Sequence, residues 1–402
     1  MTVDTGRTIT TRDVVAQVAQ VAQLANDVFA ARAAEYDQTA RFPTEDFDDL
    51  FAAGLNAPTV PTEYGGLGLG PYQRNTLPLW MMTTALARAD LSLARCWEGH
   101  ANSMVLIDAL GSPPQRERWF DGVVARGEKW AAWSGEPPAP AGNGKRRFGT
   151  DLTRTRDGWV VDGTKIFATS AAGADHAILL VHLAGPGGAR HHEGSDDGLI
   201  MLACDLSHPS ITIDGSWWDP IGMRATVSHL VRFDHTPIPD SCRIGEPGDY
   251  LRQGWQTAFA PHYAASFLGA AEAAYDYTLD HARQRGKTAD PYVQHRVGTM
   301  AVDIETAHLW LAEVAARWDR GDRAGAEIGG NRARHLLERL SLAAVDHCVR
   351  VCGAGSLIRP SPVERIVRDL TLYARHDNDD HILATIGRQI LGQQHDLSFY
   401  RP

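Results

Sequence analysis

The apolar residues of the first 130 positions recur with the spacing of amphipathic helices. Between residues 12 and 36 they stand three or four positions apart, which is the helical period. A short second helix is expected over 47–53, where Gly54 ends it, and the helical pattern returns from Leu77 to Leu110. These spacings predict a mainly helical N-terminal domain over residues 1–130.

The pattern changes after residue 130 to short apolar runs separated by Gly and Pro, which is typical of strands. The runs predicted to be strands are Trp159–Lys165, His176–His182, Leu199–Leu206, Ser210–Ile213 and His229–Phe233. They predict a small antiparallel β domain over residues 131–247. The His191-His192 pair falls in a polar, Gly-bearing insertion, and with no acid or Cys ligand at matching spacing it favours a solvated loop over a metal site.

Helical spacing dominates again in residues 248–402. Three long periodic segments and a shorter fourth are predicted to pack as an antiparallel four-helix bundle: 258–285, 292–319, 330–352 and 382–391. The chain is therefore expected to be mainly α with a central β domain, in the order helical domain, β domain, helical bundle.

Composition narrows the class of protein. With 402 residues and 44% hydrophobic content the chain can bury a large core, and its net charge of -10 argues against general nucleic-acid or membrane binding. The five scattered cysteines are expected to be buried free thiols, with no metal site. No apolar run approaches the ~20 residues of a membrane helix, and no signal-peptide core is present, so a cytoplasmic protein is expected.

Several short motifs, in order along the chain, carry a resemblance to the acyl-CoA dehydrogenase family. They are Pro61-Thr62-Glu63-Tyr64-Gly65-Gly66, Ser134-Gly135-Glu136-Pro137, Lys165-Ile166-Phe167-Ala168-Thr169-Ser170, Gly222-Met223-Arg224 and Gly353-Ala354-Gly355, followed by Pro362-Val363-Glu364-Arg365. Each motif alone is weak evidence, but all of them together stand in the order and at the spacing of the family's motifs. The resemblance implies the family's three-domain fold, a bound FAD or FMN, and a homotetramer in which neighbouring subunits complete each flavin site.

The resemblance also implies which residues hold the flavin. Trp133 and Ser134 would line the edge of the ring system, and Phe167 and Thr169 its far face and central nitrogen. The other positions with family counterparts are Arg283 for a phosphate, with Arg285 or Lys287 as substitutes, and Gly353, Gly355 and Arg368. The alternatives are strand-core packing for the aromatic residues, a solvated helix end for the cations and a helix C-cap for the glycines.

The segment after Arg368-Asp369 departs from the dehydrogenase pattern. Where the family has a Glu-Gly-Thr whose Glu removes the substrate α-proton, this chain has Asp377-Asn378-Asp379. Asp377 is one methylene shorter than Glu, and ~1 Å of misplacement can cost about a hundredfold in rate. Asp379 or Asp380 would cap the following helix. The alternative base position, early in the first bundle helix, is closed because residues 257–271 contain no Asp or Glu.

A different branch of the family resembles this segment more closely. Flavin-dependent monooxygenases related to dibenzothiophene monooxygenase have His-Asp-Pro here, and this chain has His376-Asp377-Asn378; His100 matches a second His of that branch. A flavin hydroperoxide needs hydrogen-bond donors rather than a strong base, and His100, His376 and Ser134 could supply them.

The resulting prediction is a two-component monooxygenase that uses reduced flavin and O₂ on a small organic substrate. A separate flavin reductase is expected because the chain shows no Gly-rich nicotinamide-binding βα unit. Two alternatives stay open: a dehydrogenase of acyl-CoA or carrier-bound thioesters with Asp377 as base, and a flavin-binding protein without catalysis.

Overall fold

The N-terminal part of the chain is helical, and a short π-helical turn joins its first two helices. The computed structural model describes residues 11–138, 149–156, 158–185 and 198–394. The helices are α1 (Thr11–Leu24), the π-helical turn (Ala25–Phe29), α2 (Ala30–Thr39), α3 (Thr44–Ala52), α4 (Thr76–Ala89), α5 (Leu91–Leu110) and α6 (Pro113–Arg126). The single helix expected over 77–110 is two, because Asp90 leaves the helical conformation and its carboxylate accepts the Ser92 N–H at 2.8 Å as an N-cap.

One mixed sheet forms the middle of the molecule. Its strands are β1 (Trp130–Trp133), β2 (Asp151–Arg154), β3 (Trp159–Ala168), β4 (His176–Ala184), β5 (Leu199–Asp205), β6 (Ile211–Asp214), β7 (His229–Ile238) and β8 (Arg243–Ile244). The order is β6-β7-β3-β2-β4-β5-β8, with β1 also on β4. The expectation of an antiparallel domain is wrong for two pairs, because β1 and β2 both run parallel to β4.

The two parallel strands follow one another along the same edge of β4. β1 pairs with His176–Leu179 and β2 with His182–Ala184, so the chain leaves the sheet between them. The buried Lys165 fills the interval, where its ammonium donates to the Leu180 carbonyl at 2.6 Å and pairs with Glu136. We call this interval between β1 and β2 the break; the chain leaves the sheet there, after Trp133. The His191-His192 pair lies outside the described residues.

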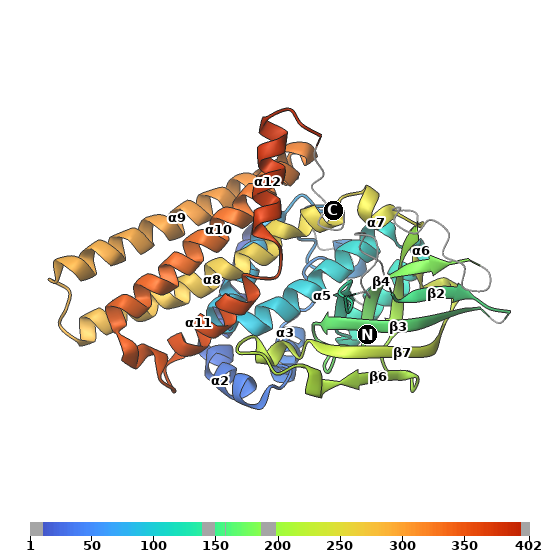
Figure 1. Ribbon diagram of the computed structural model, residues 1–402, viewed down its shortest axis with the longest axis horizontal. Helices are drawn as coiled ribbons and strands as arrows, with labels where there is room; N and C mark the ends of the chain where they lie inside the picture. Colours follow the sequence, from blue (N-terminus) through green and yellow to red (C-terminus); the bar gives the residue numbers. More distant parts are fainter. Residues whose placement is uncertain (1–10, 139–148, 157, 186–197, 395–402) are drawn as a thin grey trace.

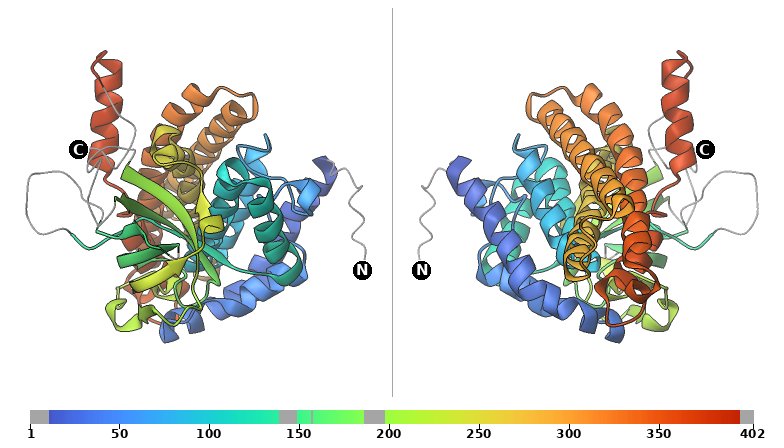
Figure 2. Two further views of the ribbon diagram at one scale, coloured as in Figure 1. Left: turned by 90° about the vertical axis from the view of Figure 1, so that its right-hand side faces the viewer. Right: turned by 90° about the vertical axis from the view of Figure 1, so that its left-hand side faces the viewer.

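The C-terminal part of the chain is a helical bundle beside the sheet, with α5 between them (Figure 1). The short α7 (Asp249–Arg252) lies against β5, and the helices that follow it are α8 (Trp255–Gln284), α9 (Pro291–Asp319), α10 (Arg323–Cys352), α11 (Pro362–Tyr373) and α12 (Asp379–Ile390). The apolar spacing did not predict α11, which packs against α8 and α10. The expected fourth bundle helix is α12, and it projects away from the others (Figure 2).

The hydrophobic core crosses the sequence boundaries between these parts. One cluster of buried side chains joins α4 and α5 to α8 and α10, and a separate cluster lies on the sheet. All five cysteines are free thiols, and three are buried, whereas Cys242 and Cys352 are partly exposed. None of the described helices has the length and apolar character needed to cross a membrane.

Candidate active site

Two adjoining cavities open where α5, the end of β1, the start of α8 and the segment after α11 meet. We call the larger one, of about 740 Å³, the slot, and the smaller one, of about 140 Å³, the pocket. Residues that line both cavities are Arg95, Ala132, Trp133, Ser134, Gln256, His376 and Asp377. The structure thus brings Trp133, Ser134, His376 and Asp377 together, although they lie about 240 positions apart in the sequence.

Aromatic rings and hydroxyl groups form the wall of the slot. Phe167 has a left-handed backbone (φ 50°), which is costly for an aromatic residue, and its side chain is 60% exposed. Its ring meets that of Trp217 edge-on at 5.0 Å. Thr169 lines the same wall, with its hydroxyl 3.1 Å from that of Ser228, and its carbonyl accepts the Trp133 indole N–H at 2.8 Å. An open aromatic face beside hydroxyl groups fits the flat, polar-edged ring of a flavin.

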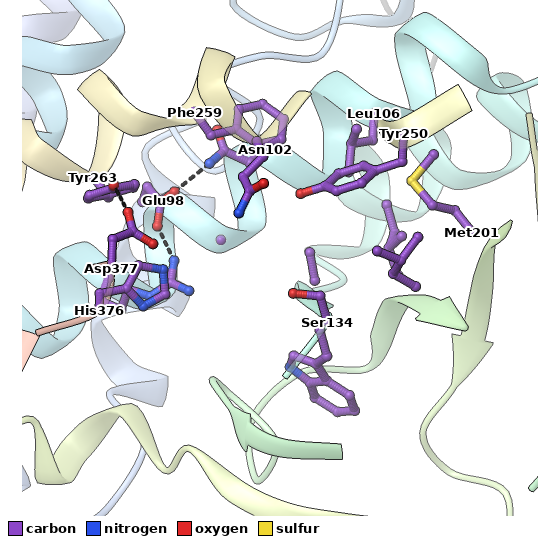
Figure 3. A pocket seen from close by; sticks show the side chains of 17 residues that line it. Glu98, Asn102, Leu106, Ser134, Met201, Tyr250, Phe259, Tyr263, His376 and Asp377 are labelled. Atoms are coloured by element: carbon purple, nitrogen blue, oxygen red, sulfur yellow. Dashed lines mark hydrogen bonds and ion pairs between the residues drawn. The ribbon is translucent and has the colours of Figure 1, made fainter. Parts of the chain in front are cut away.

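Asp377 lies at the polar end of the pocket (Figure 3). Its Oδ2 accepts a hydrogen bond from the Tyr263 hydroxyl, and Arg334 Nε is 4.0 Å away. Burial raises the pKa of the Asp377 carboxyl to about 7; the nearby Glu98 adds to the rise and Arg95 opposes it. Asp377 therefore changes protonation state near neutral pH.

His376 stands beside Asp377 where the slot and the pocket meet. Its ring packs edge-on against Tyr263 at 5.3 Å and Tyr373 at 5.9 Å, and its ring nitrogens have no hydrogen-bond partner among the described residues. His376 is exposed, because its ring borders the two cavities. Desolvation by the surrounding protein, followed by the charges of Arg95 and Arg334, lowers its pKa to about 3. The imidazole is therefore neutral near pH 7 and offers one donor and one acceptor.

A polar network on α5, which the motifs did not predict, supports this end of the pocket. Arg95 forms an ion pair with Glu98, and the Asn102 amide donates to the other Glu98 oxygen. His262 on α8 holds Asn102 in turn, with Nδ1 2.8 Å from Asn102 Oδ1. Arg95, Glu98 and Asn102 are three and four positions apart, so polar residues at helical spacing in an otherwise apolar helix were the available signal.

The opposite end of the pocket is apolar. Leu106 and Met201 lie at this end with Tyr250 beside them (Figure 3), and Ile178, Leu180 and Phe259 also line the pocket. These side chains come from α5, β4, β5 and α8. The apolar end suits a hydrophobic ring or chain, whereas the end near Asp377 suits a polar group.

His100 is not at the pocket. Its Nε2–H donates to the Asn56 carbonyl at 2.7 Å, and its Nδ1 accepts the Trp130 N–H at 3.0 Å. Burial and the charge of Lys129 lower the pKa of His100 to about 4. The prediction that His100 serves as a donor to the flavin is therefore corrected: both ring nitrogens are occupied by the backbone, and His100 ties α5 to β1.

The contacts of Arg368 also lie outside the slot. Its guanidinium pairs with Asp37 at 2.7 Å and Glu364 at 2.8 Å and donates to the Ile221 carbonyl at 2.8 Å. These contacts hold α11 to α2 and to the loop before Met223, outside the slot.

The capping prediction for the next helix is corrected too: Asn378 caps α12, and Asp379 instead pairs with Arg334 at 2.7 Å.

The remaining predicted residues lie far from the slot within one chain. Arg283 and Arg285 stand at the C-terminal end of α8, about 30 Å along the helix from the pocket-lining Tyr263. Arg283 is exposed and pairs only with Asp280, at 3.1 Å, among the described residues. At Gly353 and Gly355 a Cβ atom would meet no other atom within 4 Å. This chain alone does not bring these four residues to its own slot.

Comparison with known proteins identifies the class. Acyl-CoA dehydrogenase N-terminal, middle and C-terminal domain models match residues 11–128, 131–236 and 262–380, and the chain belongs to this family. It is accordingly a flavin-dependent oxidoreductase with FAD or FMN as cofactor.

The relatives include both enzyme types. A putative acyl-CoA dehydrogenase, YdbM of Bacillus subtilis, is 27% identical over 86% of this chain and 88% of its own. Dibenzothiophene monooxygenase of Rhodococcus erythropolis is 25% identical over 91% of each chain. The structure of FMN-bound TdsC from Paenibacillus sp. A11-2 superposes with a TM-score of 0.84 at 22% identity, over 96% of this chain and 100% of TdsC.

Proposed function

We propose that this protein is a monooxygenase that uses reduced flavin and O₂ to oxygenate a small organic substrate. The observation that carries the proposal is His376, a neutral imidazole without a protein partner among the described residues, where the slot meets the pocket. A reduced flavin supplies the electrons that activate O₂. His376 and Ser134, which both line the slot and the pocket, would donate hydrogen bonds to an activated oxygen between flavin and substrate.

The slot residues would hold the flavin ring. Phe167, Trp133 and Thr169 form the wall on which the ring would lie, and Arg283 with Gly353 and Gly355 would meet the phosphate end of a flavin in a neighbouring subunit. A separate flavin reductase would deliver the reduced cofactor.

The dehydrogenase alternative rests on Asp377. Its carboxyl lines the pocket, and a pKa of about 7 suits a general base. Anaerobic addition of butyryl-CoA to the oxidised flavoprotein separates the two functions, because only a dehydrogenase bleaches the flavin. For the monooxygenase, mixing the photoreduced complex with O₂ should give flavin reoxidation in at least two phases with a transient absorbance. Single-phase reoxidation with rapid bleaching by the thioester would contradict our proposal.

We expect the protein to be a homotetramer. The flavin-phosphate residues lie about 30 Å from the same chain's pocket, and α9 presents exposed Val302 and Leu309, seven positions apart on one face, for burial against another subunit. Light scattering at micromolar concentration should give four times the chain mass. A monomer mass would contradict the shared site.

We expect Arg283→Ala to weaken flavin binding about ten- to a hundredfold, since a charge-assisted hydrogen bond contributes ~1.5–3 kcal/mol. Arg350→Ala is a matched control, because Arg350 is also exposed (56%, against 65% for Arg283) and paired with an aspartate on its own helix. Fluorescence titration of FMN and FAD measures both dissociation constants. An unchanged constant in Arg283→Ala would move the phosphate contact to Arg285 or Lys287.

A further inference from the structure

Glu98 and Asp377 are the two carboxylates at the polar end of the pocket, and they differ in how many of their oxygens already accept a hydrogen bond. Both Glu98 oxygens accept hydrogen bonds, one from Arg95 and one from Asn102. Asp377 Oδ2 accepts from Tyr263, whereas Asp377 Oδ1 has no hydrogen-bond partner among the residues that the structure describes. An ionised carboxylate is an acceptor only, and leaving one of its oxygens unmatched in an enclosed site is costly. The pocket therefore has one strong acceptor available for a ligand.

The nearby cations do not neutralise Asp377 once it is ionised. The Arg95 charge is matched by Glu98, and that of Arg334 by Glu338 and Asp379. The other polar side chains that line the pocket beside these charged groups are uncharged: His376, which is neutral, and Asn102, Ser134, Tyr250 and Gln256. A ligand group placed here meets an acceptor with a net negative charge and a neutral imidazole, an environment that favours hydrogen-bond donors and disfavours anions.

We propose that the pocket selects small apolar ring compounds that carry an N–H or O–H group, and that Asp377 Oδ1 is the acceptor that recognises this group. The inference rests on the proposed function, for which it defines the substrate class. The ring would lie among Leu106, Met201 and Phe259, and the donor would point to Asp377 beside His376. The oxygen would then be delivered at or next to the donor-bearing atom, because His376 adjoins both the slot and the pocket.

The size of the pocket supports a ligand of one ring. Its volume is about 140 Å³, and apolar cavities of about 150 Å³ in another protein bind benzene. Aniline, phenol and toluene are therefore suitable probes, because they have nearly the same size and differ in the donor: an N–H₂, an O–H or none.

The test is a comparison of dissociation constants for the three probes with the flavin-loaded protein, measured by calorimetry in the absence of any reductant. We expect at least one donor-bearing probe to bind about tenfold more tightly than toluene, as for a hydrogen bond to a charged acceptor. Preference for aniline alone would identify amines, and preference for phenol alone would identify hydroxyl compounds. Equal affinity for all three would overturn the proposal.

The Asp377→Asn variant tests the acceptor itself. Tyr263 would keep donating to the amide oxygen, so the amide N–H₂ would face the donor of the probe, and the preference over toluene should disappear while toluene binding stays unchanged. Asp380→Asn is the control, because Asp380 is exposed, three positions further on, and lines neither cavity. A preference that survives in Asp377→Asn would contradict the assignment.

The unmodified protein provides a second test should the variant fold poorly. Groups facing Asp377 are Arg95 and Glu98 from α5, Tyr263 from α8, Arg334 from α10 and the adjacent His376. With a carboxyl pKa of about 7, the preference should be full near pH 8 and fade toward pH 6, where Asp377 is protonated and both neutral probes keep their form. A preference equal at both pH values would contradict the role of Asp377. These binding results do not depend on oxygen transfer. If the donor-bearing probes bind more tightly than toluene but no oxygenated product forms, the monooxygenase proposal is rejected and the binding role of Asp377 stands.

Discussion

The His376→Ala variant is expected to consume reduced flavin and O₂ at near the parent rate while releasing hydrogen peroxide in place of oxygenated product. The variant removes the neutral imidazole that adjoins both the slot and the pocket, and with it a hydrogen-bond donor to the activated oxygen. Loss of one such preorganised donor costs about 10²- to 10³-fold in the rate of the step that it assists. Oxygen uptake, peroxide detection and product analysis on the same sample measure the uncoupling.

Asp377→Asn is the paired variant that separates the two enzyme classes. In a monooxygenase it should raise KM for donor-bearing substrates, yet retain most of kcat, because the amide keeps the shape of the side chain and the Tyr263 hydrogen bond. In a dehydrogenase it removes the base and should cost about 10²- to 10⁴-fold in rate, while His376→Ala is mild. Rapid anaerobic bleaching by a thioester in the parent, abolished in Asp377→Asn, would reject the monooxygenase.

The motif residues that line the slot together are each tied to a local backbone feature. Phe167 and Thr169 lie at the end of β3, where the backbone becomes left-handed, and Trp133 and Ser134 stand at the end of β1, where the break before β2 begins. Such residues are placed by their own strand, so a short sequence pattern locates them. His376 and Asp377 come three and four positions after the end of α11, so their places are likewise set by an adjoining element.

The predictions that were wrong concern residues whose contacts come from distant parts of the chain. The partner of His100 is the Asn56 carbonyl, 44 positions away, and Arg368 meets Asp37, 331 positions away. The parallel pairing of β1 and β2 with β4 depends on Lys165 filling the interval, which no periodicity reveals. Arg95 and Glu98 were not predicted for a different reason. Their helix was predicted, but the sequence pattern did not show which of its faces lines the pocket.

Charged residues of α11 show how such long-range pairs stabilise the fold. Arg365 is almost fully buried and donates to the Ala89 carbonyl at 3.1 Å; its guanidinium lies 3.4 Å from Asp90 and 3.8 Å from Asp369. Asp369 in turn accepts the Met223 N–H at 2.5 Å, beside the slot. Burial raises the pKa of both carboxyls, to about 7 for Asp369, and Arg365 opposes the rise. Arg365 thus offsets the charge of two buried carboxylates.

We expect Arg365→Ala to lower the free energy of unfolding by ~3–5 kcal/mol at about pH 8, the usual cost of leaving a buried charge without its partner. Urea denaturation followed by circular dichroism measures the change. Arg359→Ala is the control: Arg359 is exposed on the loop before α11 and pairs at 3.3 Å with Glu364, so its loss should cost less than ~1 kcal/mol.

The loss should also depend on pH in a defined direction. Because the pKa of Asp369 is higher in the folded state than in the unfolded chain, the folded state binds more protons between about pH 4 and 7, and stability falls as pH rises through that window. Removing Arg365 raises the folded-state pKa further and extends the fall to higher pH. The difference between parent and variant should therefore be larger near pH 8 than near pH 5.5, where both carboxyls can take up a proton. An equal loss at both pH values would show that Arg365 acts through packing rather than through the charges of Asp90 and Asp369.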